Sequence, residues 1–395
     1  MKKLLFLLLS VGFGFLSRAQ TASDYYQAPI DTFLSSRYLG EKRKVTVILP
    51  SGFSTSKATR FPLIVVFDRQ NRRIFRQTFE SINYLVSFDE MPAAVVIGIS
   101  TDDRKRFFET SLLASTERAT GEKFINFLYE ELIPWAEKEL NCGTNRLFIG
   151  HSRFGYFSSY LLANKLTQLT GVISCSPFFL QPNVHVVDTL KQALQTSPLN
   201  HTVYYRFITG DTATDTKDYA LMKSFLSSAK WQKQFNWKGT EYYNARHFAV
   251  PGLGVMPSLV EMFDYWSEEM NRVLQSQAPF DRNVYQEFKQ KMRQHYGDEI
   301  GLGLAVLNGI GYKFYNRQRY NEARQAWLLL LEEYPMFAEA WVSIADAYGK
   351  EGNRKEAISY YEQAKKVLAN NTFYTQMQRQ EMRTEIDAAL KELRN

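Results

Sequence analysis

Short apolar runs alternate with segments of helical periodicity between about residues 42 and 275. The runs have the length of strands, and several are apolar on both faces, as in a sheet that helices cover on both sides. Between them, apolar residues recur at helical spacing over 124–140, 155–166 and 255–274. This alternation predicts an α/β fold with a doubly wound, mostly parallel sheet, whose strand order the pattern leaves open. The predicted strands are VTVILP (45–50), PLIVVFD (62–68), AAVVIGIS (93–100), RLFIGHS (146–152), GVISCSP (171–177), VYYRFITG (203–210) and KGTEYY (238–243).

The strand pattern stops after residue 275, where SQAPFDRN predicts a linker into an all-helical tail. In this tail a pattern of small and large residues recurs after 34 residues, which is typical of two tetratricopeptide repeats. Two repeats rarely bury enough surface alone, so we expect helices at about 283–303 and 373–393 to cap the stack. The predicted domains are therefore an α/β domain at 25–275 and a small helical domain at 283–395. The matched positions are Leu307 and Trp341, Ile310 and Ile344, Gly311 and Ala345, Phe314 and Tyr348, Ala323 and Ala357, and Trp327 and Tyr361.

The first twenty residues have the pattern of a secretory signal. Lys2 and Lys3 precede the apolar run LLFLLLSVGFGFL, and Ser17, Arg18 and Ala19 follow it. We expect residues 1–19 to form a signal peptide that is cleaved after Ala19. No later segment approaches the roughly 18 apolar residues that a spanning helix needs. The sequence thus predicts an exported protein, periplasmic or secreted, with no membrane span after cleavage.

Net charge and cysteine positions further limit the kind of protein that the sequence can encode. The chain has 395 residues and a formal net charge of +7, which falls to +4 without Lys2, Lys3 and Arg18. This mild excess, with no basic block or basic-aromatic stripe, argues against a nucleic-acid surface. Cys142 and Cys175 are predicted at opposite ends of neighbouring parallel strands, too far apart for a disulfide. We therefore predict two free cysteines.

The stretch FIGHSRFGYF (148–157) contains the candidate nucleophile. Ser152 stands two residues after Gly150, between a predicted strand and a predicted helix. A sharp turn at such a junction exposes the serine oxygen at the carboxyl edge of the sheet. Phe154 replaces the glycine expected two residues after the serine. We expect a local rearrangement in which Gly155 takes over the close contact between strand and helix.

A general base must lie at the same edge of the sheet and after Ser152 in the chain. His247 is the histidine that meets this condition, because it follows the last predicted strand and precedes the helix at 255–274. The other histidines are predicted inside the nucleophile turn and packed against neighbouring strands (His151), in a lid (His185), at the start of a strand (His201) and in the helical tail (His295).

An orienting carboxylate is expected after the strand VYYRFITG. Asp211 follows this strand directly and is the preferred residue, but Asp215 stays open, and either could cap the next helix instead. The resulting chain order of serine, aspartate and histidine is the one that α/β-hydrolases use. The amide of Arg153 is expected to face the oxyanion, with Gln70 as the second donor and Arg69 as its alternative. The Arg153 side chain either contacts an anionic substrate or is simply solvated.

The sequence resembles the esterase branch of the α/β-hydrolases that contains esterase D and the enterobactin-type siderophore esterases. The resemblance covers roughly residues 30–270. Members usually carry Gly-His-Ser-x-Gly-Gly at the turn and an Asp-Gly-Gln-like loop after the early strand, where this chain has Gly-His-Ser-Arg-Phe-Gly and Asp-Arg-Gln. The resemblance implies an α/β-hydrolase fold, carboxylic ester hydrolysis, and serine, acid and histidine at Ser152, Asp211 and His247. The stretches that carry it are RYLGEKRKVTVILPSGF, PLIVVFD, VVIGISTDDRKR, FLYEELIPWAEKEL, RLFIGHS and GVISCSP, with the late His247.

Two functions follow as hypotheses. The first is an exported serine esterase that acts on a small-molecule ester through an acyl-enzyme, with substrate choice set by residues 69–76 and 178–200. The second is a catalytically retired hydrolase domain that binds a protein partner through its repeat tail. No cofactor is expected, and a metal hydrolase is disfavoured because neither paired histidines nor HExxH occurs.

Overall fold

The computed structural model describes residues 25–54, 56, 58–112, 116, 118–181, 183–211, 213–369, 371 and 373–395. The predicted signal peptide at 1–19 lies outside this part of the chain, as does the side chain of Asp215. Across the described ranges, none of the helices combines the length and the apolar character that crossing a membrane requires.

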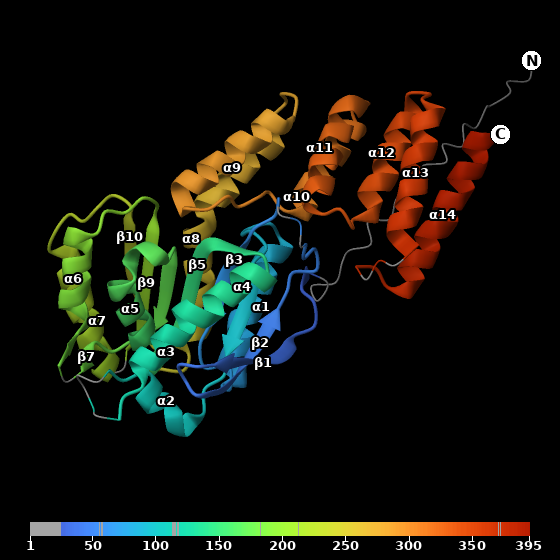
Figure 1. The fold of residues 1–395 in the computed structure, drawn as a ribbon. Coiled ribbons are helices and arrows are strands. Elements are labelled where there is room, and N and C mark those ends of the chain that lie inside the picture. Colours follow the sequence, from blue (N-terminus) through green and yellow to red (C-terminus); the bar gives the residue numbers. More distant parts are fainter. Residues whose placement is uncertain are drawn as a thin grey trace, which may run out of the picture.

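An eight-stranded sheet forms the centre of the first domain (Figure 1). The two strand pairs at one edge, which share the second strand, are antiparallel, and the other five pairs are parallel. The predicted α/β class with a mostly parallel sheet is therefore confirmed. The spatial order is β1 (Ile30–Ser36), β2 (Glu41–Ile48), β4 (Val95–Ile99), β3 (Phe61–Val66), β5 (Cys142–His151), β6 (Gly171–Cys175), β9 (Val203–Gly210) and β10 (Phe235–Tyr242).

Helices cover both faces of this sheet. Helices α1 (Arg72–Ser87) and α8 (Val250–Gln275) pack against each other, and α5 (Arg153–Asn164) packs on β5, β6 and the next helix, α6. Figure 1 shows α4 in front of the sheet and α8 behind it. The remaining elements of this domain are α2 (Asp103–Glu109), α3 (Gly121–Phe127), a π-helical turn (Leu128–Leu132), α4 (Ile133–Glu139), a 3-10 turn (Leu166–Gln168), β7 (Leu180–Gln181), β8 (Val184–His185), α6 (Val186–Thr196) and α7 (Ala213–Ser227).

Residues 72–76, which we expected to form a substrate loop, are instead the first turns of α1. Phe75, Ile82 and Leu85 on this helix are buried. Their helical spacing was present in the sequence, but the charged residues around Arg72 and Arg73 obscured it. Substrate choice therefore cannot depend on a loop over 72–76.

Both cysteines are free and buried, as predicted. Cys142 is at the start of β5, opposite Phe61 on β3 in the sheet, whereas Cys175 is at the end of β6, opposite His151 on β5. The two thiols thus lie at opposite edges of the sheet. Burial raises the pKa of Cys175 to about 12, so its thiol stays protonated and unreactive near neutral pH.

The helical tail forms two hairpins of paired helices with a further helix at its end (Figure 1). Helix α10 packs on α11, α12 packs on α13, and α14 packs along α13 as a cap. Gly311 faces Trp327, so closely that a Cβ atom would lie 2.3 Å from the indole Nε1. The elements are α10 (Leu304–Tyr315), α11 (Tyr320–Glu333), α12 (Ala338–Lys350), α13 (Arg354–Ala369) and α14 (Gln376–Arg394).

Helix α9 (Arg282–Tyr296), which we predicted to cap the other end of the stack, also joins the tail to the sheet. The hydroxyl of Tyr204 on β9 is 2.7 Å from His295 Nε2, and the amide of Thr202 donates to the His295 carbonyl. On its other side, Tyr285 hydrogen-bonds the carboxylate of Glu333 at the end of α11. Helix α9 is therefore bonded to both the sheet domain and the repeats.

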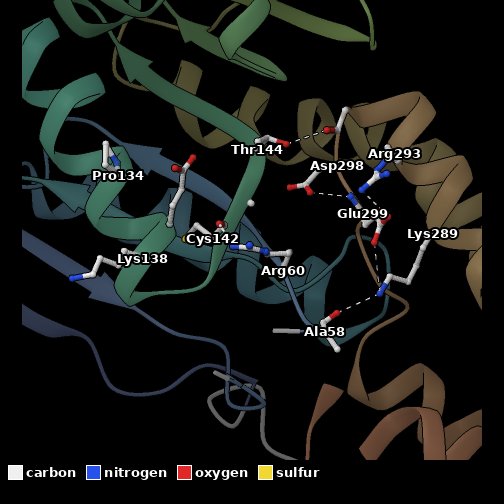
Figure 2. Close-up of a pocket in the computed structure, with 13 residues that line it drawn as sticks. Ala58, Arg60, Pro134, Lys138, Cys142, Thr144, Lys289, Arg293, Asp298 and Glu299 are labelled. Carbon is white, nitrogen blue, oxygen red and sulfur yellow. Dashed lines mark hydrogen bonds and ion pairs between the residues drawn. The ribbon is translucent and has the colours of Figure 1, made fainter. Parts of the chain in front are cut away.

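A cavity of about 700 Å³ lies where α9 meets the amino end of β5 (Figure 2). Figure 2 shows Lys289 and Arg293 opposite Arg60 and Cys142 across this cavity. Glu299 forms an ion pair with Arg293 at 2.9 Å, so much of the lining charge is neutralised locally. Because Cys142 begins β5 and Ser152 follows its end, the cavity is at the edge of the sheet opposite the candidate nucleophile.

Candidate active site

Ser152 occupies a strained turn between β5 and α5. Its backbone has φ 58° and ψ −117°, a conformation that non-glycine residues rarely adopt. The amide of Ser152 donates to the carbonyl of Cys175 on the neighbouring strand at 2.8 Å. A Cβ atom on Gly150 would lie 2.2 Å from the Phe154 carbonyl oxygen, so the turn requires glycine there. Strained turns of this kind are used to present a nucleophile.

Phe154 points into the core of the domain. Its side chain is fully buried and stacks on Phe67, with ring centroids 4.9 Å apart and planes 7° apart. Gly155 makes the close contact expected of it, because a Cβ atom there would lie 2.8 Å from the carbonyl oxygen of Cys175. The aromatic substitution thus changes the packing beneath the turn while the strained backbone of Ser152 is kept.

The structure brings His247 to the strand that carries the serine. His247 lies between β10 and α8, and its ring centroid is 4.6 Å from that of His151, the residue before Ser152. His151 Nε2 is 3.0 Å from the carbonyl oxygen of His247. We expected His151 to pack against neighbouring strands; its buried ring also contacts His247 and Phe248 in the loop before α8. The sequence offered no signal for this, because the partners are far apart in the chain.

The two candidate acids lie beyond the end of β9. Asp211 is exposed, and its Oδ2 accepts a hydrogen bond from the amide of Asn244 at 2.8 Å, in the loop that leads to His247. Its own amide donates to the carbonyl of Ala245 in the same loop. In the part of the chain described, Asp211 is bonded to this loop and has no hydrogen bond to the His247 ring. The side chain of Asp215, at the start of α7, is outside that part.

The two amides predicted as oxyanion donors belong to Arg153 and Gln70. Arg153 is the first residue of α5, where helix geometry leaves the amide without an intrahelical acceptor. Neither amide donates a hydrogen bond to any residue that the structure describes. The Gln70 side chain is engaged elsewhere, since Nε2 donates to Asp68 and Oε1 accepts from the Thr101 amide. Arg69 directs its Nε to Thr46 Oγ1.

An ion pair between Arg106 and Asp68, which the sequence did not predict, stabilises this edge of the sheet. Arg106 on α2 donates from Nε to both carboxylate oxygens of Asp68 at 2.9 Å, and from Nη2 to the His151 carbonyl at 3.4 Å. Helix α2 is itself held by the buried bidentate pair between Glu109 and Arg43 of β2. The run DDRKR (102–106) contains Arg106, but nothing in the sequence indicates that Asp68 and the His151 carbonyl are its partners.

The fold and the serine turn define an α/β-hydrolase-like protein, followed by a helical tail. The sequence profile of the family described as "Putative esterase" matches residues 36–273, and the chain belongs to this family. A tetratricopeptide repeat profile matches residues 338–367, which span α12 and most of α13. The predicted family and the predicted repeat in the tail are both confirmed. No curated protein matches the chain significantly.

Solved structures share the fold at low sequence identity. An uncharacterised protein from Capnocytophaga ochracea is 17% identical with a TM-score of 0.57, and the match covers 91% of this chain and all of that one. An IroE-like serine hydrolase from Shewanella oneidensis is 14% identical with a TM-score of 0.60, over 77% of this chain and 99% of that one. The BES protein from Bacillus cereus is 16% identical with a TM-score of 0.51, over 59% and 94%.

Proposed function

We propose that this protein is an exported serine hydrolase that cleaves carboxylic esters, with Ser152 as nucleophile and His247 as general base. The observation that carries the proposal is the strained backbone of Ser152 at the junction of β5 and α5. Membership of the esterase family and the contact between His247 and the residue before Ser152 support it. The amides of Arg153 and Gln70 are available to bind an oxyanion.

In the proposed mechanism, Ser152 Oγ attacks the ester carbonyl carbon while His247 takes the hydroxyl proton. The negative charge moves onto the carbonyl oxygen, where the two amides stabilise it. Collapse of this intermediate breaks the bond to the alcohol oxygen, which leaves with the proton from His247. Water, deprotonated by His247, then attacks the acyl group on Ser152, and the acid product leaves as the serine regains its proton.

The test compares the wild-type protein with Ser152→Ala on short-chain 4-nitrophenyl esters. We expect turnover by the wild type and its loss in the variant, with fluorophosphonate labelling confined to the protein that retains Ser152. Equal turnover by both proteins would exclude Ser152 as nucleophile. The N-terminal sequence of the mature protein, expected to begin at Gln20, tests export separately.

Asp211 and Asp215 are the two candidates for the orienting acid. Substituting each one distinguishes an aspartate that orients His247 from one that only holds the loop. An aspartate that orients the histidine and stabilises its cation is expected to cost about 10³- to 10⁴-fold in kcat when it becomes asparagine. An aspartate that only bonds the Asn244 amide is expected to cost less than about tenfold, because only the loop loosens. Measuring kcat for Asp211→Asn and Asp215→Asn assigns the acid, and small losses in both would exclude a triad with either.

The repeat tail favours a second candidate function, in which the hydrolase domain is retired and the protein binds a partner through its helices. Paired helices of this type form extended binding surfaces. Failure of the fluorophosphonate probe to label folded wild-type protein would support this alternative. Labelling of Ser152 would count against it.

A further inference from the structure

The side chain of Arg153, the residue after the candidate nucleophile, is a positive charge for which the described part of the chain offers no anionic partner. Its Nη1 is 3.5 Å from Thr110 Oγ1, and its guanidinium carbon lies 4.3 Å from the Phe107 ring centroid and 5.4 Å from that of Phe178. No described carboxylate lies within ion-pair distance of it, although the chain forms many such pairs elsewhere. The sequence had left open whether this arginine is simply solvated, and the two aromatic contacts argue that it is not.

The energetics of this arrangement are unfavourable unless an anion arrives. Partial burial lowers the pKa of Arg153, and the nearby positive charge of Arg106 lowers it further. The charge of Arg106 is already balanced by the carboxylate of Asp68. The cluster of Arg106, Asp68 and Arg153 therefore has one positive charge in excess, next to Ser152. Cation–π contacts with the two rings offset part of the desolvation cost, but apart from the long hydrogen bond from Nη1 to Thr110 Oγ1 the N–H donors have no acceptor among the described residues.

Apolar surface surrounds this charge. Phe107 is 47% exposed, and Phe248, whose ring contacts that of His151, is 76% exposed. Large aromatic side chains exposed at a reactive edge suit an apolar or aromatic portion of a ligand. The guanidinium among them can supply a fork of donors that matches a carboxylate.

We propose that the ester cleaved at this site carries a carboxylate, which Arg153 binds. The inference rests on the proposed function and adds the substrate class. A carboxylate carries one negative charge and balances the single excess positive charge of the cluster. A phosphate dianion would leave the cluster with a net negative charge. Arg153 follows Ser152 directly in the chain, with Cα atoms about 3.8 Å apart, so one ligand can contact both side chains. The preference arises from binding, so it acts mainly on KM.

The test uses two matched pairs of esters. The first compares 4-nitrophenyl hydrogen glutarate with 4-nitrophenyl hexanoate and places the charge on the acyl side. The second compares 3-(carboxymethyl)phenyl butanoate with 3-propylphenyl butanoate and places it on the alcohol side. We expect the wild type to prefer the charged member of one pair by about 10- to 100-fold in kcat/KM, the factor that one charge-assisted hydrogen bond supplies. High salt should reduce this preference.

Arg153→Gln should bring the ratio within the preferred pair close to one, and Arg153→Lys should keep part of it. Arg104→Gln is the matched control, since Arg104 is a highly exposed arginine on the helix that carries Phe107, and it should keep the full ratio. Circular dichroism verifies that each variant is folded.

The outcomes separate the inference from the proposed function. Hydrolysis of the neutral esters without preference for either charged one, or a preference that Arg153→Gln leaves intact, would overturn the inference alone. Stronger inhibition by inorganic phosphate than by the monoanion butanoate would overturn the choice of a carboxylate. Absence of turnover on all four esters would overturn the proposed function, and the inference with it.

Discussion

The ring of His151 is hydrogen-bonded to the main chain of His247, with Nε2 3.0 Å from the carbonyl oxygen. A carbonyl oxygen only accepts, so Nε2 of His151 carries the proton and donates it. This bond ties the end of β5, immediately before Ser152, to the loop that presents the candidate base. His151 is therefore a positioning residue in the proposed mechanism, because it acts through His247 and not on the substrate.

The first prediction concerns His151→Phe, which keeps a ring of similar width but removes the N–H donor. Loss of one hydrogen bond that fixes the base is expected to lower kcat about tenfold, with KM little changed, since the substrate is not contacted. Steady-state kinetics on a neutral 4-nitrophenyl ester measures kcat and KM separately.

His151→Gln keeps a side-chain donor and should recover part of the lost kcat. His185→Gln is the control, because His185 is an exposed histidine on β8. A wild-type kcat for His151→Phe would show that the bond has no part in positioning.

Local patterns predicted most of the sheet, because buried parallel strands leave continuous apolar runs. Strand β1 was not predicted: it lies at the sheet edge, and Ile30 and Phe33 on it are about half exposed. The position of Ser152 also followed from local sequence. The stacking of Phe154 on Phe67 did not, because the two rings meet only when β3 and α5 are packed. Pairings such as His151 with His247, or Arg106 with Asp68, require the same three-dimensional information.

The second prediction concerns the pH dependence of stability at the junction between α9 and the sheet. His295 stacks on Tyr265 with ring centroids 4.0 Å apart. Burial lowers the pKa of His295 from 6.5 to about 4, and His201 contributes to the shift. Between these values the unfolded chain binds the proton more tightly than the folded one. The stabilising contribution of neutral His295 is therefore present above pH 6.5 and is lost as the pH falls towards 4.

His295→Gln removes this titration. We expect its Tm to fall less steeply than that of the wild type between pH 6.5 and 4, whatever its Tm at neutral pH. Thermal unfolding followed by circular dichroism at several pH values provides the slopes. His185→Gln, which removes an exposed histidine, should follow the wild type, and parallel curves for His295→Gln would refute the assignment.

The third prediction uses two glycines on helix α10. Gly309 and Gly311 lie two residues apart in the same helix, so alanine should improve the intrinsic helix propensity equally at both, by about 1 kcal/mol. Their surroundings differ. A Cβ atom on Gly309 would have no neighbour within 4 Å, whereas one on Gly311 would lie 2.3 Å from Nε1 of Trp327.

The indole of Trp327 is fully buried and cannot easily move, since its Nε1 donates to Asn308 Oδ1 at 2.9 Å. Gly311→Ala must therefore separate α10 from α11 or break this bond, at a cost of about 1–3 kcal/mol that exceeds the gain in propensity. We expect Gly309→Ala to raise the free energy of unfolding of the tail and Gly311→Ala to lower it, as measured by urea unfolding. Because propensity is the same at both positions, the difference between the variants isolates the contact between the helices, and equal effects would mean that this contact does not limit their approach.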